Sequence, residues 1–267
     1  MKSSFINCLG KPVAVFEFGN ASNPAIFFVH GNSAPSGFFL PVIKLLEAKY
    51  HIITLDLPGH KQSAAWNKED FTRENLALLL NSVLDYFNIS EVDAFGFSMG
   101  GLILLECFDL VPAIKKIAIA GHPPLSSLAD MAQAYNLNED SSLYLQGALS
   151  DEEIERIYDA VIAIDNKQIK AEIKRALKET SPSFREGCTL LAQHVGDQTI
   201  RLNNSAMPIA IFHAKNDLAI QLSYLEKLQI KNLWEQKIQI IPDSGHFMIG
   251  EKPAEMAQVL DRFFACN

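Results

Sequence analysis

Short apolar segments alternate with longer amphipathic ones along most of this chain, and this alternation constrains its fold more than any other feature. The short segments, rich in β-branched and aromatic residues, are 25–30, 52–57, 92–97, 114–120, 209–213 and 238–241. The helix-length segments are 37–49, 73–87, 99–110, 218–228 and 253–264. Strands that are apolar throughout are buried on both faces, as in a parallel sheet. The pattern predicts an α/β fold with a doubly wound, mostly parallel sheet, whose ligand crevice lies beyond the carboxyl ends of the strands.

Two regions depart from this alternation. Segments 5–9 and 12–18, separated at Gly10, predict an antiparallel pair at the N-terminus. Between residues 123 and 206 no strand pattern is found, but apolar residues recur at helical spacing. Prolines at 123–124 and at 208 interrupt regular structure at its two ends. We therefore expect a helical insertion, residues 123–206, after the sixth strand of a core formed by residues 1–122 and 207–267.

A Gly-x-Ser-x-Gly turn joins the predicted strand 92–97 to the helix that follows it. Residues 96–100 read Gly-Phe-Ser-Met-Gly. Glycine two residues on either side of the serine lets strand and helix approach closely, so that the hydroxyl of Ser98 projects into the crevice. The helix that follows directs its free N–H groups and positive dipole end at this position, which suits a developing oxyanion. We predict that Ser98 is a nucleophile.

A serine hydroxyl needs a base beside it, and the base needs an orienting acid. His246 lies on the loop after the predicted strand 238–241, and Asp217 lies on the loop after strand 209–213. Ser98, Asp217 and His246 follow the chain order expected of this class of turn. Asp243, three residues before His246, is the alternative acid, although its position suits a turn. We predict a catalytic triad of Ser98, Asp217 and His246.

These residues resemble the α/β-hydrolase superfamily, and the resemblance covers nearly the whole chain outside the insertion. Residues 28–32, Phe-Val-His-Gly-Asn, resemble the family's His-Gly loop after the third strand. The resemblance implies that the backbone N–H groups of Asn32 and Met99 form an oxyanion hole. Residues 55–60, Leu-Asp-Leu-Pro-Gly-His, resemble the segment after the fourth strand, for which we expect no catalytic role. Lys61 departs from the family pattern, which commonly has glycine there.

In this family the insertion after the sixth strand is a helical cap over the active site, which excludes water and shapes the pocket. The resemblance therefore implies that residues 123–206 cover the triad. The candidate pocket residues are His30, His122, Tyr144 and Phe184. His30 is also expected to brace the oxyanion loop. A long helical insertion needs apolar packing of its own, so Tyr144 and Phe184 suit the interior of the cap equally well.

The composition excludes several other classes of protein. Lys and Arg total 23 against 31 Asp and Glu, a net charge of −8, so the chain lacks the positive field that nucleic acids attract. No apolar stretch approaches the roughly 18–20 residues of a membrane-spanning helix. The sequence shows no clustered Cys/His pattern and no Gly-x-Gly-x-x-Gly at the first βα turn. We expect no metal and no cofactor.

The expected compartment is the cytoplasm. The N-terminus lacks the apolar segment of a signal peptide. The four cysteines are scattered rather than paired in the dense pattern of a small secreted scaffold, which is typical of reduced thiols. They are Cys8, Cys107, Cys188 and Cys266.

The predicted function is a cofactor-independent serine hydrolase that cleaves a small carboxylic ester or thioester through an acyl-serine. A carbon-carbon bond hydrolase, a lactonase and a cofactor-free haloperoxidase are alternatives on the same triad. A serine at position 98 argues against the branches of the family that use an aspartate nucleophile. An alternative of another class is a non-enzymatic sensor that binds a small molecule in the capped pocket.

Overall fold

The computed structural model describes residues 1–162 and 166–266, and its central element is an eight-stranded sheet of order β1-β2-β4-β3-β5-β6-β7-β8. Strands β1 and β2 are antiparallel to each other, β2 is antiparallel to β4, and the remaining neighbours are parallel. The strands are β1 Lys2–Cys8, β2 Lys11–Phe18, β3 Ala25–Val29, β4 His51–Leu55, β5 Val92–Phe97, β6 Ile114–Ala120, β7 Ile209–Ala214 and β8 Gln239–Ile241. The predicted strands and the antiparallel N-terminal pair are confirmed.

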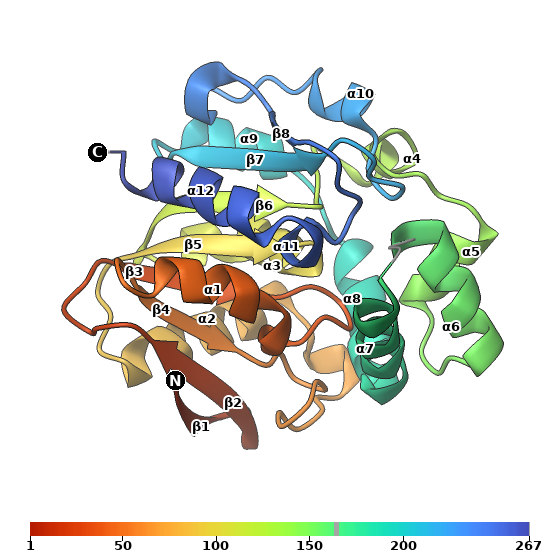
Figure 1. The fold of residues 1–267 in the computed structure, drawn as a ribbon, viewed down its shortest axis with the longest axis horizontal. Helices are drawn as coiled ribbons and strands as arrows, with labels where there is room; N and C mark the ends of the chain where they lie inside the picture. The colour runs from red at the N-terminus through yellow and green to blue at the C-terminus, as the bar shows by residue number, and fades with distance from the viewer. Residues whose placement is uncertain (163–165, 267) are drawn as a thin grey trace.

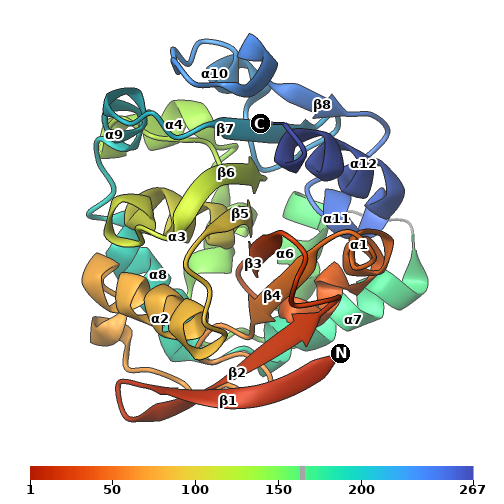
Figure 2. The ribbon, with the colours of Figure 1, turned by 90° about the vertical axis from the view of Figure 1, so that its left-hand side faces the viewer.

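Helices cover both faces of this sheet, as the doubly wound prediction requires. The core helices are α1 Leu40–Leu46, α2 Arg73–Tyr86, α3 Met99–Cys107, α10 Leu222–Leu225, α11 Met248–Glu251 and α12 Pro253–Phe264. Figure 2 shows α1 and α12 on one side of the sheet and α2 and α3 on the other. Two apolar clusters fill the two spaces between sheet and helices. Burial of this apolar surface is the main force that holds the three layers together.

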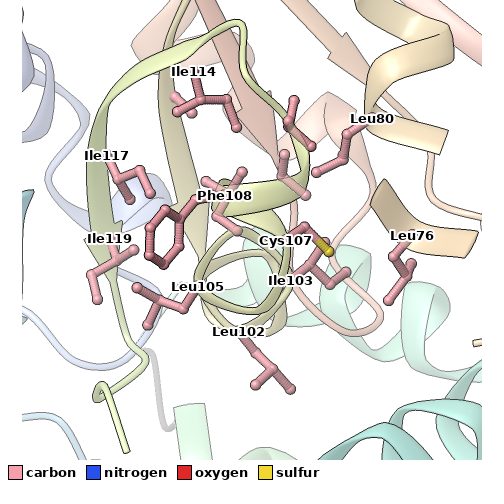
Figure 3. Packing of buried hydrophobic residues seen from close by; sticks show 14 of the residues in the cluster. Leu76, Leu80, Leu102, Ile103, Leu105, Cys107, Phe108, Ile114, Ile117 and Ile119 are labelled. Atoms are coloured by element: carbon pink, nitrogen blue, oxygen red, sulfur yellow. The ribbon is translucent and has the colours of Figure 1, made fainter. Parts of the chain in front are cut away.

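The helix after the Gly-x-Ser-x-Gly turn is buried on all sides. Leu102, Ile103 and Leu105 of α3 are at most 4% exposed. Figure 3 shows α3 side chains between Ile117 and Ile119 of β6 and the α2 side chain of Leu76. A helix that is apolar around its circumference is held on every side by packing. The position of its first turn is therefore fixed against the sheet.

The helical insertion after β6 is confirmed. Its helices are α4 Met131–Ala134, α5 Glu139–Ser142, α6 Asp151–Ile157, α7 Lys167–Glu179, α8 Pro182–Ala192 and α9 Gln198–Asn204. In Figure 1, α5 to α8 lie beyond the arrowheads of β5, β6 and β7. The insertion therefore stands over the edge of the sheet where the crevice is expected. Its treatment as a separate domain with limits at 123 and 206 stays a prediction.

The predicted helix at 218–228 is wrong for most of its length, because only Leu222–Leu225 form a helix. The N–H groups of Ala219 and Ile220 donate to the carboxylate of Asp217, 2.8 and 3.1 Å away. The N–H of Gln221 donates to the carbonyl of Ala134 in the insertion, 2.9 Å away. These bonds draw the segment away from helical pairing and onto the insertion. The apolar residues Ile220, Tyr224 and Leu225 of this segment are buried in the cluster that also contains Ala134 of the insertion.

None of the helices within residues 1–162 and 166–266 combines the length and the apolar character needed to cross a membrane.

Candidate active site

Ser98 lies at the junction of β5 and α3 in a strained backbone conformation, with φ 50° and ψ −118°. A side chain with positive φ is held there only when the surroundings impose it. Two close approaches do so. A Cβ at Gly100 would lie 2.0 Å from the carbonyl oxygen of Val29, and a Cβ at Gly96 would lie 2.6 Å from that of Gly100. These glycines let α3 start directly above the sheet, and Ser98 faces a cavity there.

The structure brings together the three residues that the sequence predicts as a triad. His246 Nε2 is 3.2 Å from Ser98 Oγ, and His246 Nδ1 is 3.0 Å from Asp217 Oδ2. Asp217 Oδ1 also accepts the N–H groups of Ala219 and Ile220. The side chain of Asp217 is fully buried, and that of His246 is 9% exposed. Asp243, the alternative acid, is not among the hydrogen-bond partners that the described residues provide for His246.

Asp217 and His246 shift each other's pKa in opposite directions. Burial alone would raise the pKa of Asp217, but the charge of His246 and the bonds from its ring and from Ala219 outweigh burial and lower it. Burial alone would lower the pKa of His246, but Asp217 outweighs burial and raises it. The carboxylate is thus charged at neutral pH and holds the imidazole with Nδ1–H toward itself. This tautomer leaves Nε2 as an acceptor for the Ser98 hydroxyl.

Asn32 and Met99, the predicted oxyanion-hole residues, both line the cavity beside Ser98. Met99 is the first residue of α3, where the backbone N–H has no partner inside the helix. The backbone N–H of Asn32 likewise has no acceptor among the described residues. Free N–H groups at a helix start attract negative charge. Within the described part of the chain, Asn32 and Met99 therefore each carry an unpaired backbone N–H at the wall of the cavity that Ser98 also lines.

The insertion holds the loop that follows β3, called the oxyanion loop here because it carries the predicted donor Asn32, through hydrogen bonds between Tyr144 and Asn32. The Nδ2 of Asn32 donates to the carbonyl of Tyr144, 2.9 Å away, and the Tyr144 hydroxyl donates to the carbonyl of Asn32, 2.6 Å away. Ser33 Oγ donates to Asn32 Oδ1 at 2.9 Å. Asn32 is thus held by two hydrogen bonds to Tyr144 of the insertion and by one from Ser33, the next residue of the loop.

Two residues that the sequence did not single out complete this support. Arg185 of α8 is 1% exposed, and its Nη1 donates to Ser33 Oγ at 3.3 Å and to the carbonyl of Leu177 at 3.1 Å. His60 Nε2 accepts the N–H of Ser33 at 3.0 Å. His60 belongs to the segment that resembles the family, so a signal for it was present. Arg185 carries no such signal, because a lone arginine in an amphipathic helix usually lies in solvent.

A cavity of about 120 Å³ lies between Ser98 and the cap. His122 and Tyr144, two candidate pocket residues, line it, as does Tyr135. Apolar side chains form much of the remaining wall, among them Leu102, Met131, Leu145, Val161 and Ile220.

The placement of His30 and Phe184 in the pocket is wrong. His30 is fully buried beneath the oxyanion loop, where its Nε2 accepts the N–H of Leu57 at 2.8 Å and its Nδ1–H donates to the carbonyl of Gly31 at 2.7 Å. This is the bracing role also expected for it. Phe184 is fully buried and packs edge-on against His60, with ring centroids 4.3 Å apart. Phe184 therefore joins the cap to the core.

Within residues 1–162 and 166–266, no group of three His, Cys, Asp or Glu side chains could hold a metal ion.

Comparison with curated proteins gives partial matches. The 3-oxoadipate enol-lactonase 1 of Acinetobacter baylyi is 34% identical over 99 residues, which are 37% of this chain and 36% of that protein. The uncharacterized hydrolase YugF of Bacillus subtilis is 36% identical over 90 residues, which are 34% of this chain and 33% of that protein. The matched segments thus span about a third of the length of these curated relatives.

A solved structure and a protein family match over much more of the chain. The crystal structure of N-acyl homoserine lactonase AidH complexed with N-butanoyl homoserine has a TM-score of 0.90 at 24% identity, and the match covers 99% of this chain and 96% of that one. Residues 24–253 match the family described as alpha/beta hydrolase fold. This match includes both parts of the sheet and the insertion between them. The chain therefore belongs to the alpha/beta hydrolase fold family.

Proposed function

We propose that this protein is a serine hydrolase that cleaves a small carboxylic ester, a lactone or a thioester through an acyl-serine intermediate. The observation that carries the proposal is the hydrogen-bonded row from Ser98 through His246 to Asp217 on the wall of a cavity. Each member has the partner that its chemical role requires. Asn32 and Met99 line the same cavity, and their backbone N–H groups are the proposed oxyanion donors.

The geometry supports a two-step reaction. Ser98 Oγ attacks the carbonyl carbon while His246 Nε2 takes its proton, and the carbonyl electron pair moves to the oxygen, which the N–H groups of Asn32 and Met99 bind. The intermediate collapses, and the leaving alkoxide or thiolate takes the proton from His246. Water then attacks the acyl-serine, and His246 accepts a proton from the water and returns it to Ser98 Oγ. The free acid leaves.

The cavity favours small substrates. Its volume of about 120 Å³ is close to the ~150 Å³ of a protein cavity that accommodates benzene. Short acyl and alcohol groups fit such a space. The names of two similar proteins include a lactonase activity, and a lactone is a cyclic ester. We therefore include lactones in the proposed substrate class.

The proposal is tested by covalent labelling combined with turnover. A fluorophosphonate probe is expected to modify one residue per chain, Ser98, because activation by His246 is confined to that hydroxyl. Peptide mass spectrometry locates the adduct, and unfolded protein in denaturant is the control that removes activation. p-Nitrophenyl acetate and butyrate are expected to turn over, and prior labelling is expected to stop this. Rapid labelling without turnover of any short ester would instead favour the small-molecule sensor.

The pH dependence of kcat/KM is expected to show an acid limb with its midpoint above the ~6.5 of a free imidazole. His246 accepts a proton only when its ring is neutral, and Asp217 raises its pKa. Activity should therefore be present at pH values above the raised pKa and decline about tenfold per unit below it. The measurement is kcat/KM between pH 5 and 9, with circular dichroism at each pH as a control for folding. A midpoint below 6 in folded protein contradicts the assigned pair.

A further inference from the structure

Glu251, the last residue of α11, binds the loop of His246 on both sides of the histidine. The N–H of Gly245, the residue before His246, donates to both carboxylate oxygens of Glu251, at 3.1 Å each. The carbonyl of Phe247, the residue after His246, accepts the backbone N–H of Glu251 at 3.1 Å. Both neighbours of the base are therefore hydrogen-bonded to one residue that is not part of the triad.

Packing encloses the same two neighbours of the base. A Cβ at Gly245 would lie 3.3 Å from Glu251 Oε1 and 3.4 Å from the carbonyl oxygen of Ile162 in the insertion. Gly245 thus lies between the carboxylate and the backbone of the insertion. The side chain of Phe247 is 4% exposed and its ring packs against that of Phe97, with centroids 5.9 Å apart. The loop is therefore anchored in the core after His246 and held by Glu251 before it.

The loop of His246 is also tied to the loop of the acid, but less close to the base. The N–H of Asn216, the residue before Asp217, donates to the carbonyl of Ser244 at 2.9 Å. Ser244 Oγ donates to the carbonyl of Ile241 at 3.2 Å. These bonds fix the loop as far as Ser244, two residues before the base. The carboxylate of Glu251 carries this support to the next residue along the chain.

Glu251 also brings a second negative charge to the base. Burial alone would lower the pKa of His246, whereas the charges of Asp217 and Glu251 both raise it. Burial raises the pKa of Glu251 itself, and the Gly245 N–H and the charges of His246 and Lys252 oppose that shift. His246 becomes positively charged when it takes the proton of the serine. A carboxylate close to its loop stabilises that state.

Two further titratable groups face His246 from the strands beside it. They are His122, two residues after β6, and His213 in β7, and the charge of His246 acts on both. Burial lowers the pKa of His122 to about 3 and also lowers the pKa of His213. Both rings are therefore neutral near pH 7. The negative charge that faces the His246 ring comes from Asp217 and Glu251.

We propose that Glu251 is a positioning residue for the catalytic base: its carboxylate holds the backbone next to His246 and faces the imidazolium that forms when Ser98 attacks. This inference rests on the proposed function, in which His246 is the base. His246 Nε2 lies 3.2 Å from Ser98 Oγ and has to stay within reach while the ring changes its charge. A displacement of about 1 Å at a reacting group costs on the order of a hundredfold in rate. The clamp on both sides of His246 limits that displacement.

The test compares Glu251→Gln with Glu251→Ala, using kcat and KM for p-nitrophenyl butyrate between pH 5 and 9. Glutamine keeps an oxygen for the Gly245 N–H but lacks the charge, so the pKa of His246 should fall. The acid limb of kcat/KM then moves to lower pH, while the rate above the limb changes less than about threefold. Alanine also removes the acceptor, so the rate above the limb should fall about ten- to a hundredfold. This loss should be in kcat rather than KM, because Glu251 is not part of the cavity wall.

Glu255→Gln is the matched control. Glu255 lies in α12, four residues further along, and is not among the charges that act on His246. Its substitution removes the same net charge and should leave the acid limb and the rate above it unchanged. The pKa of His246 is also measured without substrate, from an NMR titration of its ring in all three proteins. Circular dichroism establishes folding at each pH.

The proposal is overturned if Glu251→Gln moves the acid limb and the NMR midpoint no further than Glu255→Gln does. Folded Glu251→Ala protein with an undiminished kcat would overturn it as well. If the alanine variant does not fold, the glutamine variant alone decides. Absence of ester hydrolysis and of Ser98 labelling in the unmodified protein would defeat the proposed function, and the positioning role with it, even if the NMR midpoint moved. The two failures are therefore distinguishable.

Discussion

Ser98→Ala is expected to lower kcat for a short ester by about a million-fold, the scale on which serine hydrolases lose activity without their nucleophile. The variant keeps the N–H groups of Asn32 and Met99, which continue to polarise a bound carbonyl. Any remaining rate then reflects direct attack by water. The measurement is kcat with p-nitrophenyl butyrate, after subtraction of spontaneous hydrolysis and with circular dichroism to establish folding. Retention of more than about a hundredth of the activity would defeat the acyl-serine mechanism.

Ser98→Gly separates the hydroxyl from the backbone strain. It also lacks the nucleophile, so it should be as inactive as Ser98→Ala. At φ 50° glycine is unstrained, whereas alanine keeps the strain of a Cβ. Ser98→Gly should therefore be more stable than Ser98→Ala by about 1 kcal/mol in chemical denaturation. Equal stabilities would show that the positive φ stores no strain. Ser82→Ala, in α2 and outside the cavity wall, controls for the loss of a serine hydroxyl and should retain full activity.

The sheet was predictable because its strands signal themselves locally. The segments that form β3 to β7 are short and apolar. Such segments are typical of strands buried on both faces of a parallel sheet, so the fold class followed directly from them. The triad followed from the same logic. Parallel strands end at one edge, so residues after β5, β7 and β8 meet there. Ser98, Asp217 and His246 needed no knowledge of the cap.

The pocket was less predictable because it depends on the directions of side chains in the insertion. Tyr144 and Phe184 are both aromatic residues of the cap, yet Tyr144 reaches the cavity while Phe184 packs on His60. Their difference lies in how α8 and the neighbouring turn sit on the core, which no local pattern encodes. Arg185 illustrates the same limit. No local pattern indicates that Arg185 is buried. Only the folded structure shows that the carbonyl of Leu177 and the hydroxyl of Ser33 accept hydrogen bonds from its guanidinium group.

Gly100→Ala is expected to destabilise the protein by about 4 kcal/mol or more, which is exceptional for the addition of one methyl group. The added Cβ would lie 2.0 Å from the carbonyl oxygen of Val29 and 2.8 Å from that of His30. Both obstacles are backbone atoms of the sheet and the oxyanion loop, so no side chain can rotate away. Relief requires α3 to move off the sheet. Because α3 is packed on all sides, that movement disrupts the apolar cluster around Leu102 and Ile103.

Gly37→Ala is the matched control, because its added Cβ would meet nothing within 4 Å and its backbone φ is not positive. It should be neutral or slightly stabilising, since alanine restricts the unfolded chain. Denaturant unfolding of both variants gives the comparison, and the thermal midpoint of Gly100→Ala should fall by roughly 10 °C. Folded Gly100→Ala protein should also lose activity, because the displaced helix start moves Ser98 and the N–H of Met99 away from His246 and Asn32. If the free energies of unfolding of the two variants differed by less than about 1 kcal/mol, α3 would have room to shift. The close approach of Gly100 to Val29 would then not require a glycine at this turn.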